Sequence, residues 1–171
     1  VQTYLDRARI AAQRGSVLAR TEAAPVIERL VRVMAKLNRD LSFSTDIEPR
    51  DAALAMESQD LEEALGNLVE NAAKFARDKV VVRLRVVPGT EGKRSMYRID
   101  IIDDGPGLDE AGMSEAMKRG RRLDESKPGT GLGLSIVGEI ASEYKGTFAL
   151  AKAETGGLSA QLTLPALITE A

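Results

Sequence analysis

Two asparagines and a lysine line one stripe of a predicted helix. Asn67, Asn71 and Lys74 are spaced i, i+4 and i+7, so helical periodicity places them on the same side, beside an apolar arc. Asparagine is a poor residue for a helix interior, and a site that needs neutral oxygen donors would justify two in register. Mg²⁺ takes one or two protein oxygens and fills its other positions with water and substrate phosphates, so a phosphate would lie near Lys74. The stripe modestly favours a metal–phosphate site over its alternative, a solvated helix edge.

A second motif closes a predicted apolar strand. Asp103 follows Ile101 and Ile102 where the strand leaves the sheet, and Gly105 and Gly107 come directly after it. A buried carboxylate at this point can accept a hydrogen bond from an exocyclic amine such as that of adenine. The glycines would let the base approach the backbone in tight, positive-φ geometry. An ordinary Asp-Gly turn explains the same residues, so this motif alone leaves both interpretations open.

Three alternating glycines precede another predicted helix. Gly129, Gly131 and Gly133 present free backbone N–H groups, together with the dipole of the following helix, to an anion. The segment is neither a P-loop, which ends in Gly-Lys-Ser or Gly-Lys-Thr, nor a Rossmann turn, which follows a strand. Each glycine costs about 0.5–1 kcal/mol in conformational entropy, which a plain linker does not require. The spacing favours a phosphate-binding loop.

Positive charge is concentrated just before this loop, at Lys118, Arg119, Arg121, Arg122 and Lys127. A solvated charged face and a lid over a bound triphosphate explain such a run about equally well. In a lid, some of these side chains would neutralise the phosphates.

The elements that must position these motifs follow from periodicity. Apolar residues at the 3.6-residue period predict helices from Pro25 to about Leu37, from Asp60 to about Arg77 and from Leu134 to Tyr144. Alternation and turn residues predict strands over 41–47, 53–56, 79–87, 96–102, 147–153 and 158–164. Gly146 stands where the last helix would be capped. Residues 103–133 have little periodicity, and we expect a long loop with one short helical piece.

The order of these elements predicts the fold class. Helices and strands are interspersed, but the hairpins indicate a mixed, mainly antiparallel sheet with helices on one face, an α+β two-layer sandwich. A loop of about 30 residues within a compact domain is unusual and is typical of a functional lid. Residues 1–24 read as the tail of a helix begun upstream plus a linker, and residues 25–171 as the main domain.

Composition excludes several classes of function. The 171 residues carry 24 Lys and Arg against 26 Asp and Glu, a net charge of −2, which argues against sequence-independent nucleic-acid binding. Histidine and cysteine are both absent, which removes Ser-His-Asp catalysis, disulfides and nearly every transition-metal site. No stretch approaches the ~20 apolar residues needed to cross a bilayer and no signal peptide opens the chain, so we expect a soluble, cytoplasmic domain. A start at Val1 rather than Met suggests a fragment of a longer protein.

Taken in this order, the three motifs resemble the N, G1 and G2 boxes of the ATP-binding catalytic domain of bacterial sensor histidine kinases. That domain has the Bergerat fold of the GHKL ATPases, which Hsp90, DNA gyrase and MutL share. The resemblance covers about Leu41 to Leu164, and the ordered set of motifs is far more specific than any one of them. The basic segment resembles that of PhoQ-type sensor kinases in its Arg-Gly-x-Arg sequence at 119–122 and in the basic residue at 127.

The resemblance implies a role for each motif. Asn71 would be a Mg²⁺ ligand assisted by Asn67, and Lys74 would contact phosphate. Phe75 would pack against the adenine, and Asp103 would accept its amino group. The other ATP-binding residues that the resemblance implies are Gly105, Gly107, Arg122, Lys127, Gly129, Thr130, Gly131, Leu132, Gly133 and Leu134. The phenylalanines often found in such lids are missing, and Lys127 supplies a point charge where an arginine would supply a fork.

The resemblance also implies an activity and its partners. ATP with Mg²⁺ would donate its γ-phosphoryl group to a histidine on a dimerisation domain, whose last helix would end within residues 1–24. The further partner would be a cognate response regulator, and the parent would be a homodimeric sensor kinase of the inner membrane with this domain in the cytoplasm.

Position 67 separates the kinases from the hydrolases of this fold. The hydrolases carry a glutamate there, one turn before the metal-binding asparagine, and it activates water for ATP cleavage. Asn67 cannot act as a base, so we expect ATP to be held rather than rapidly hydrolysed. Two alternatives stay open, namely an ATPase or serine kinase of the same fold and a non-catalytic nucleotide-binding module.

Overall fold

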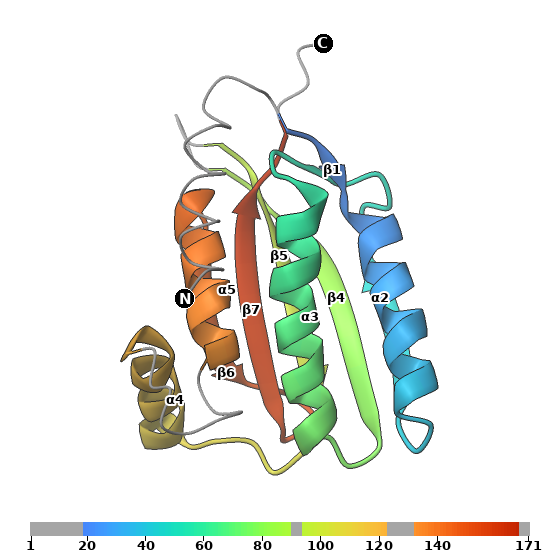
Figure 1. Cartoon of the computed structure of the whole chain (residues 1–171), viewed down its shortest axis with the longest axis vertical. Helices are drawn as coiled ribbons and strands as arrows, with labels where there is room; N and C mark the ends of the chain where they lie inside the picture. Colours follow the sequence, from blue (N-terminus) through green and yellow to red (C-terminus); the bar gives the residue numbers. More distant parts are fainter. Residues whose placement is uncertain (1–18, 90–93, 123–131, 168–171) are drawn as a thin grey trace.

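A five-stranded sheet forms one layer of the molecule and helices form the other (Figure 1). The computed structural model describes residues 19–89, 94–122 and 132–167, with only the backbone at 119–122 and 132. In these residues the strand order is β2 (Ser42–Ile47), β4 (Lys79–Val87), β5 (Met96–Asp103), β7 (Leu158–Pro165) and β6 (Thr147–Lys152). β2 is parallel to β4, and every other neighbouring pair is antiparallel. The predicted mixed, mainly antiparallel sheet is confirmed.

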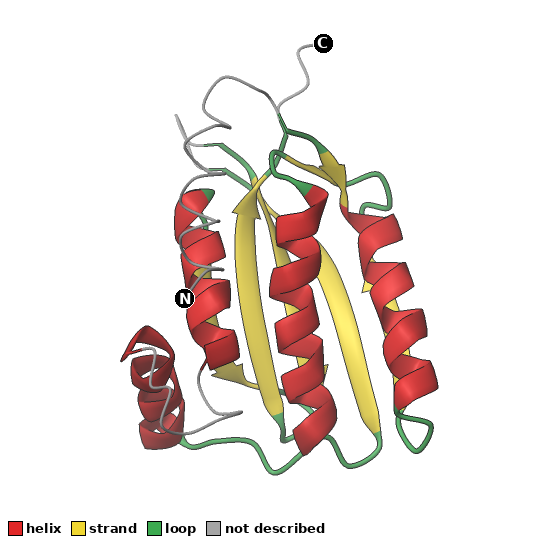
Figure 2. Cartoon of the chain, viewed as in Figure 1, coloured by secondary structure: helices red, strands yellow, loops and turns green. Residues whose placement is uncertain are grey.

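Helices α2 (Ala23–Leu37), α3 (Ser58–Phe75) and α5 (Leu132–Glu143) lie side by side on one face of the sheet (Figures 1 and 2). Their apolar arcs turn toward the strands, so that Leu61, Leu65 and Leu68 of α3 are almost fully buried. Alternate strand residues point back at the helices. These buried strand residues are Val80, Val82, Leu84, Ile99, Ile101, Leu162 and Leu164. The α+β two-layer sandwich predicted from the sequence is therefore confirmed.

The opposite face of the sheet is polar where β2 meets β4. Asp46 of β2 accepts hydrogen bonds from Arg85 at 2.7 Å and from Arg83 at 3.3 Å. The hydrogen bond from Arg85 is the main reason that the pKa of Asp46 lies below its ordinary value, although burial opposes it. These pairs tie the edge strand to its neighbour on the face that lies away from the helices.

Several element bounds differ from the predictions. The helices α2, α3 and α5 begin at residues 23, 58 and 132 rather than 25, 60 and 134. The short strand β1 (Thr21–Glu22) was not predicted, and it pairs with β3 (Ala53–Leu54) outside the main sheet. Two paired residues carry no periodicity, so only the tertiary fold identifies β1. The expected short helical piece is α4 (Glu110–Arg122), which has 13 residues and packs beside α5.

Gly146 lies at the capped end of α5, as predicted, although the left-handed residue is the one before it. Lys145, with φ of 58°, takes the left-handed position after the helix, and Gly146 donates its N–H to the carbonyl of Ala141 at 2.7 Å. A Cβ at position 146 would lie 2.1 Å from the carbonyl oxygen of Thr163. Glycine is required at 146 because the segment after α5 approaches β7 closely. Lys145 takes the left-handed conformation, and the N–H of Gly146 caps the helix.

Candidate functional site

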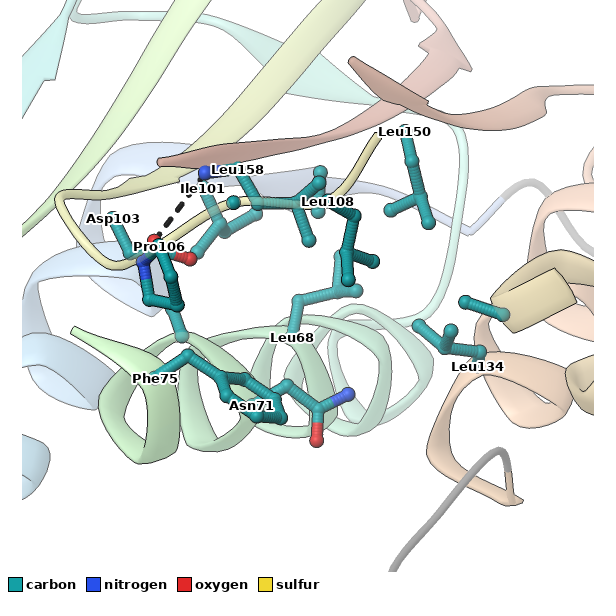
Figure 3. Close-up of a pocket in the computed structure, with 14 residues that line it drawn as sticks. Leu68, Asn71, Phe75, Ile101, Asp103, Pro106, Leu108, Leu134, Leu150 and Leu158 are labelled. Carbon is teal, nitrogen blue, oxygen red and sulfur yellow. Dashed lines mark hydrogen bonds between the residues drawn. The ribbon is translucent and has the colours of Figure 1, made fainter. Parts of the chain in front are cut away.

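A mostly apolar cavity of about 250 Å³ opens where α3 and β5 both end (Figure 3). Its walls come from α3, from β5 and the segment after it, from the β6–β7 hairpin, from the middle of α4 and from the start of α5. The lining residues are Leu68, Asn71, Ala72, Phe75, Ile101, Asp103, Pro106, Gly107, Leu108, Ala116, Leu134, Leu150, Leu158 and Ala160. An apolar cavity with a few convergent polar groups is the usual form of a small-molecule site. Here the polar side chains are those of Asn71 and Asp103, on opposite walls.

Of the predicted stripe on α3, Asn71 reaches the cavity. Asn71 and Phe75 line the cavity, and Phe75 is 60% exposed, which leaves its ring at the rim. Asn67 lies one turn back, where its side-chain amide donates to the carbonyl of Glu63 at 2.8 Å. A Cβ on Gly133 would lie 3.1 Å from Oδ1 of Asn67, so this amide oxygen faces the first turn of α5. Lys74 is exposed on the same helix.

Asp103 is the last residue of β5 and is buried, with 3% of its surface exposed. Its Oδ1 accepts the backbone N–H of Gly105 at 2.9 Å and that of Leu158 at 3.3 Å. In the part of the chain that the structure describes, neither of these hydrogen bonds uses Oδ2, and the carboxylate points into the cavity (Figure 3). The carbonyl oxygen of Asp103 accepts a further hydrogen bond from the Thr155 hydroxyl at 2.7 Å. The carboxylate is therefore held by one oxygen and offers the other to a ligand.

The two glycines after Asp103 are needed for different reasons. Gly107 has φ of 68°, as predicted, and a Cβ there would lie 2.8 Å from the carbonyl oxygen of Gly156. Gly105 is not in the positive-φ region, so the prediction of such geometry at this position was wrong. Instead, a Cβ at 105 would lie 2.2 Å from the carbonyl oxygen of Phe75. Gly105 lets the segment after β5 rest on the last turn of α3.

Asp104 is a further residue of this region to which the sequence analysis assigned no role. Its Oδ1 accepts the backbone N–H groups of Arg77, Asp78 and Lys79 at 2.8, 3.0 and 3.2 Å. Burial alone would raise the pKa of Asp104, but these backbone hydrogen bonds outweigh it and hold the pKa below its ordinary value. The Asp-Asp-Gly sequence could have drawn attention to this residue, because aspartate commonly accepts backbone N–H groups at turns.

Several predicted site residues cannot be placed in the cavity. Lys127, Gly129, Thr130 and Gly131 lie outside the described residues. Arg122 ends α4 and Leu132 begins α5, and only the backbone is described at both. The remaining two residues of the glycine motif, Gly133 and Leu134, lie in the first turn of α5 beside α3 and the cavity. The structure thus brings together the first two motifs and the C-terminal end of the third.

The side-chain oxygen donors that α3 brings beside the cavity are the amides of Asn67 and Asn71. In the described ranges no group of three or more His, Cys, Asp or Glu side chains is arranged to hold a metal ion. Asn71 and Asn67 project from α3 at consecutive turns. Such a donor set suits an ion that keeps most of its water and substrate ligands, as Mg²⁺ does, and not an ion that needs a complete protein cage.

Residues 56–168 match the model of the histidine kinase-, DNA gyrase B- and HSP90-like ATPases. The chain belongs to this family. The match begins just before α3 and includes β5, the segment after it and α5, which are the elements that build the cavity. The family that the three ordered motifs predict is therefore confirmed.

Within this ATPase family, the chain is homologous to sensor histidine kinases. It is 34% identical over 145 residues to the two-component sensor PhoQ of Pseudomonas aeruginosa, a match that covers 84% of this chain and 31% of the relative. It is 31% identical over 159 residues to the sensor protein PhoQ of Escherichia coli K12, covering 90% of this chain and 31% of the relative. The chain thus spans 31% of the length of these relatives.

Solved structures of the same family share the fold. The mycobacterial sensor histidine kinase MprB superimposes with a TM-score of 0.72 at 26% identity, covering 88% of this chain and 98% of that one. The ATP-binding domain of PrrB from Mycobacterium tuberculosis superimposes with a TM-score of 0.72 at 21% identity, covering 90% of this chain and 100% of that one. The similarity to PrrB supports the fold alone, whereas the similarity to MprB also agrees with the sensor kinase relatives.

Proposed function

We propose that this domain binds ATP with Mg²⁺ in the cavity at the end of α3 and donates the γ-phosphoryl group to a histidine of a dimerisation domain. The observation that carries the proposal is the carboxylate of Asp103. It is buried at one end of an apolar cavity, it is held by backbone N–H groups through Oδ1, and Asn71, whose amide oxygen could bind Mg²⁺, lines the same cavity.

The cavity is suited to adenine. A flat, mostly apolar base would fill the space between the strand residues and α3, with the Phe75 ring at its edge. The amino group of the base would donate to Oδ2 of Asp103, which satisfies a buried acceptor. Gly107 lines the same cavity, and its positive φ turns the segment after β5 there.

The phosphates would extend from the cavity toward the start of α5. Asn71 and Asn67 supply amide oxygens on that side, and when bound there Mg²⁺ would neutralise charge on the phosphates. The N-terminus of α5 would add backbone N–H groups and its dipole. Lys74, Arg122 and Lys127 are proposed to contact the phosphates, together with Gly129, Thr130, Gly131, Leu132 and Gly133.

The acceptor of the phosphoryl group must come from outside these residues. The chain contains no histidine, so its contribution is to bind ATP, to position the γ-phosphate and to neutralise charge. Asn67 occupies the position at which a hydrolase of the family would carry a base. This favours transfer to a partner over hydrolysis by water.

The proposed context is a two-component signalling system. Residues 1–24 would end the second helix of the dimerisation domain, and residues 25–171 would form the catalytic domain. The further partners would be a second copy of the parent and a cognate response regulator. Within the described residues, none of the helices combines the length and apolar character that crossing a bilayer requires. A parent in the inner membrane, with this domain on the cytoplasmic side, is therefore proposed from its relatives.

The test is phosphoryl transfer in trans. The chain is incubated with ATP labelled at the γ-phosphate, Mg²⁺ and the histidine-bearing domain of its own parent, and acid-labile, base-stable phosphate on that domain is measured. Asn71→Ala serves as the inactive comparison, and Glu70→Ala, on the exposed side of α3, as the control. Tight ATP binding without transfer, or steady release of phosphate without the partner, would contradict the kinase proposal.

A further inference from the structure

The geometry points to Asp104 as a positioning residue. It would fix the position of Asp103, the proposed hydrogen-bond acceptor for the adenine amino group, relative to α3. This inference deepens the proposed function and rests on it, because it concerns how the same cavity recognises adenine. The segment considered is the Asp103 loop, defined as residues 103–107.

Asp104 joins the Asp103 loop to the turn between α3 and β4. Its Oδ1 accepts three consecutive backbone N–H groups, those of Arg77, Asp78 and Lys79, and its Oδ2 lies 3.1 Å from the N–H of Asp78. These amides follow directly after the C-terminal end of α3 at Phe75. A single carboxylate therefore supplies acceptors for the whole turn that leaves the helix carrying Asn71.

Successive residues of the loop contact different parts of the site. The carboxylate of Asp103 points into the cavity, that of Asp104 binds the α3–β4 turn, and Gly105 packs on the carbonyl of Phe75. Because these residues are consecutive, a shift of residue 104 rotates the peptide units that carry Asp103. The other supports of Asp103 come from the β6–β7 hairpin, through Leu158 and Thr155. Asp104 is thus the side chain of the loop that fixes Asp103 relative to α3.

This arrangement predicts an effect on recognition of the base and not on binding in general. If Asp104 keeps Asp103 in register, its loss weakens the hydrogen bond to the adenine amino group and leaves contacts with the phosphates unchanged. If Asp104 only stabilises a turn, its loss lowers stability and affects all nucleotides equally. The two roles are separated by comparing ATP with purine riboside triphosphate, which lacks the amino group.

The experiment measures the affinity of the 171-residue chain for both nucleotides by competition with a fluorescent ATP analogue in Mg²⁺. The wild-type chain is expected to prefer ATP by about tenfold or more, as one hydrogen bond to a charged acceptor predicts. In Asp104→Ala this preference is expected to fall toward one, because the affinity for ATP falls while the affinity for purine riboside triphosphate hardly changes. Asp104→Asn keeps an amide oxygen for the three N–H groups and is expected to retain most of the preference. The control is Asp46→Ala, which loses ion pairs on the opposite face of the sheet.

The outcomes distinguish the inference from the proposed function. If the wild-type chain binds neither nucleotide, the proposed function fails. If the wild type prefers ATP and folded Asp104→Ala keeps the full preference, the positioning role is wrong. Should Asp104→Ala fail to fold, Asp104→Ser is used, because its short hydroxyl cannot serve all three amides; an unchanged preference in the serine variant would equally overturn the inference.

Discussion

Replacing Asp103 with asparagine tests the adenine site with almost no change in side-chain shape. Oδ1 of Asp103 receives N–H groups from Gly105 at 2.9 Å and Leu158 at 3.3 Å. In Asp103→Asn the amide oxygen must take this position, because an NH₂ group there would oppose two donors. The NH₂ group is then forced into the cavity, where it faces the adenine amino group as one donor against another.

The size of the effect follows from the hydrogen bond that is lost. A hydrogen bond to a charged acceptor contributes about 1.5–3 kcal/mol, so the affinity for ATP is expected to fall by about ten- to a hundredfold. The fold is expected to remain, because both backbone N–H groups keep an acceptor, and the free energy of unfolding should change by no more than about 1 kcal/mol.

Calorimetric titration with ATP and Mg²⁺ measures this affinity, and urea unfolding measures the stability of the same samples. Purine riboside triphosphate is the matched ligand, since it has no amino group to oppose the new NH₂ group, and its affinity should hardly change. The reasoning would be refuted by a folded variant whose ATP affinity stays within threefold of the wild type. An equal loss for both nucleotides would also refute it.

Three further predictions follow from the structure. Gly66→Ala should raise the free energy of unfolding by about 0.5–1 kcal/mol, because the new Cβ in α3 would meet nothing within 4 Å. Gly105→Ala should lower the free energy of unfolding by about 1–3 kcal/mol and weaken ATP binding, because its Cβ would lie against the carbonyl of Phe75. Urea unfolding of both variants tests whether the two changes have opposite signs. Asn71→Ala should abolish the dependence of ATP affinity on Mg²⁺, seen by titration with and without EDTA, and an unchanged dependence would exclude Asn71 as a ligand. The pKa of Asp104 is lowered in the folded state, so its stabilisation is present at neutral pH and is lost as the pH falls below about 4. As the pH is lowered, the free energy of unfolding should therefore fall less in Asp104→Asn than in the wild type. Identical curves of unfolding free energy against pH for the two proteins would contradict this.

Much of the fold could be predicted because its pattern is local. The apolar arc of α3 and the alternation of β4 are repeated over 18 and 9 residues, and burial of one face follows from such repeats. The limits of β4 were predicted at Lys79 and Val87 and confirmed there. The strand β1 could not be predicted, because its pairing with Ala53 and Leu54 involves residues about 30 positions apart and leaves no local pattern.

The sequence predicted the side chains that would contact a ligand better than it predicted the residues that hold those side chains in place. Asn71 and Asp103 were identified from residue type and position, and the structure places both in one cavity. The hairpin residues Thr155 and Leu158, which hold Asp103, were not identified. They lie more than 50 positions from it, and neither residue type indicates such a contact.

By itself the sequence determined which side chains can bind a ligand or a metal ion, because this depends on residue type. It also determined which faces of the helices and strands carry these side chains, because this depends on spacing along a few turns. The order of the three motifs was also enough to indicate the family. Tertiary structure alone decided that Gly105 rests on the carbonyl of Phe75, that Asp104 serves the turn after α3, and that Oδ2 of Asp103 is left for a ligand. These features depend on how closely distant backbones approach, and that distance is fixed only when the whole sheet and its helices have packed.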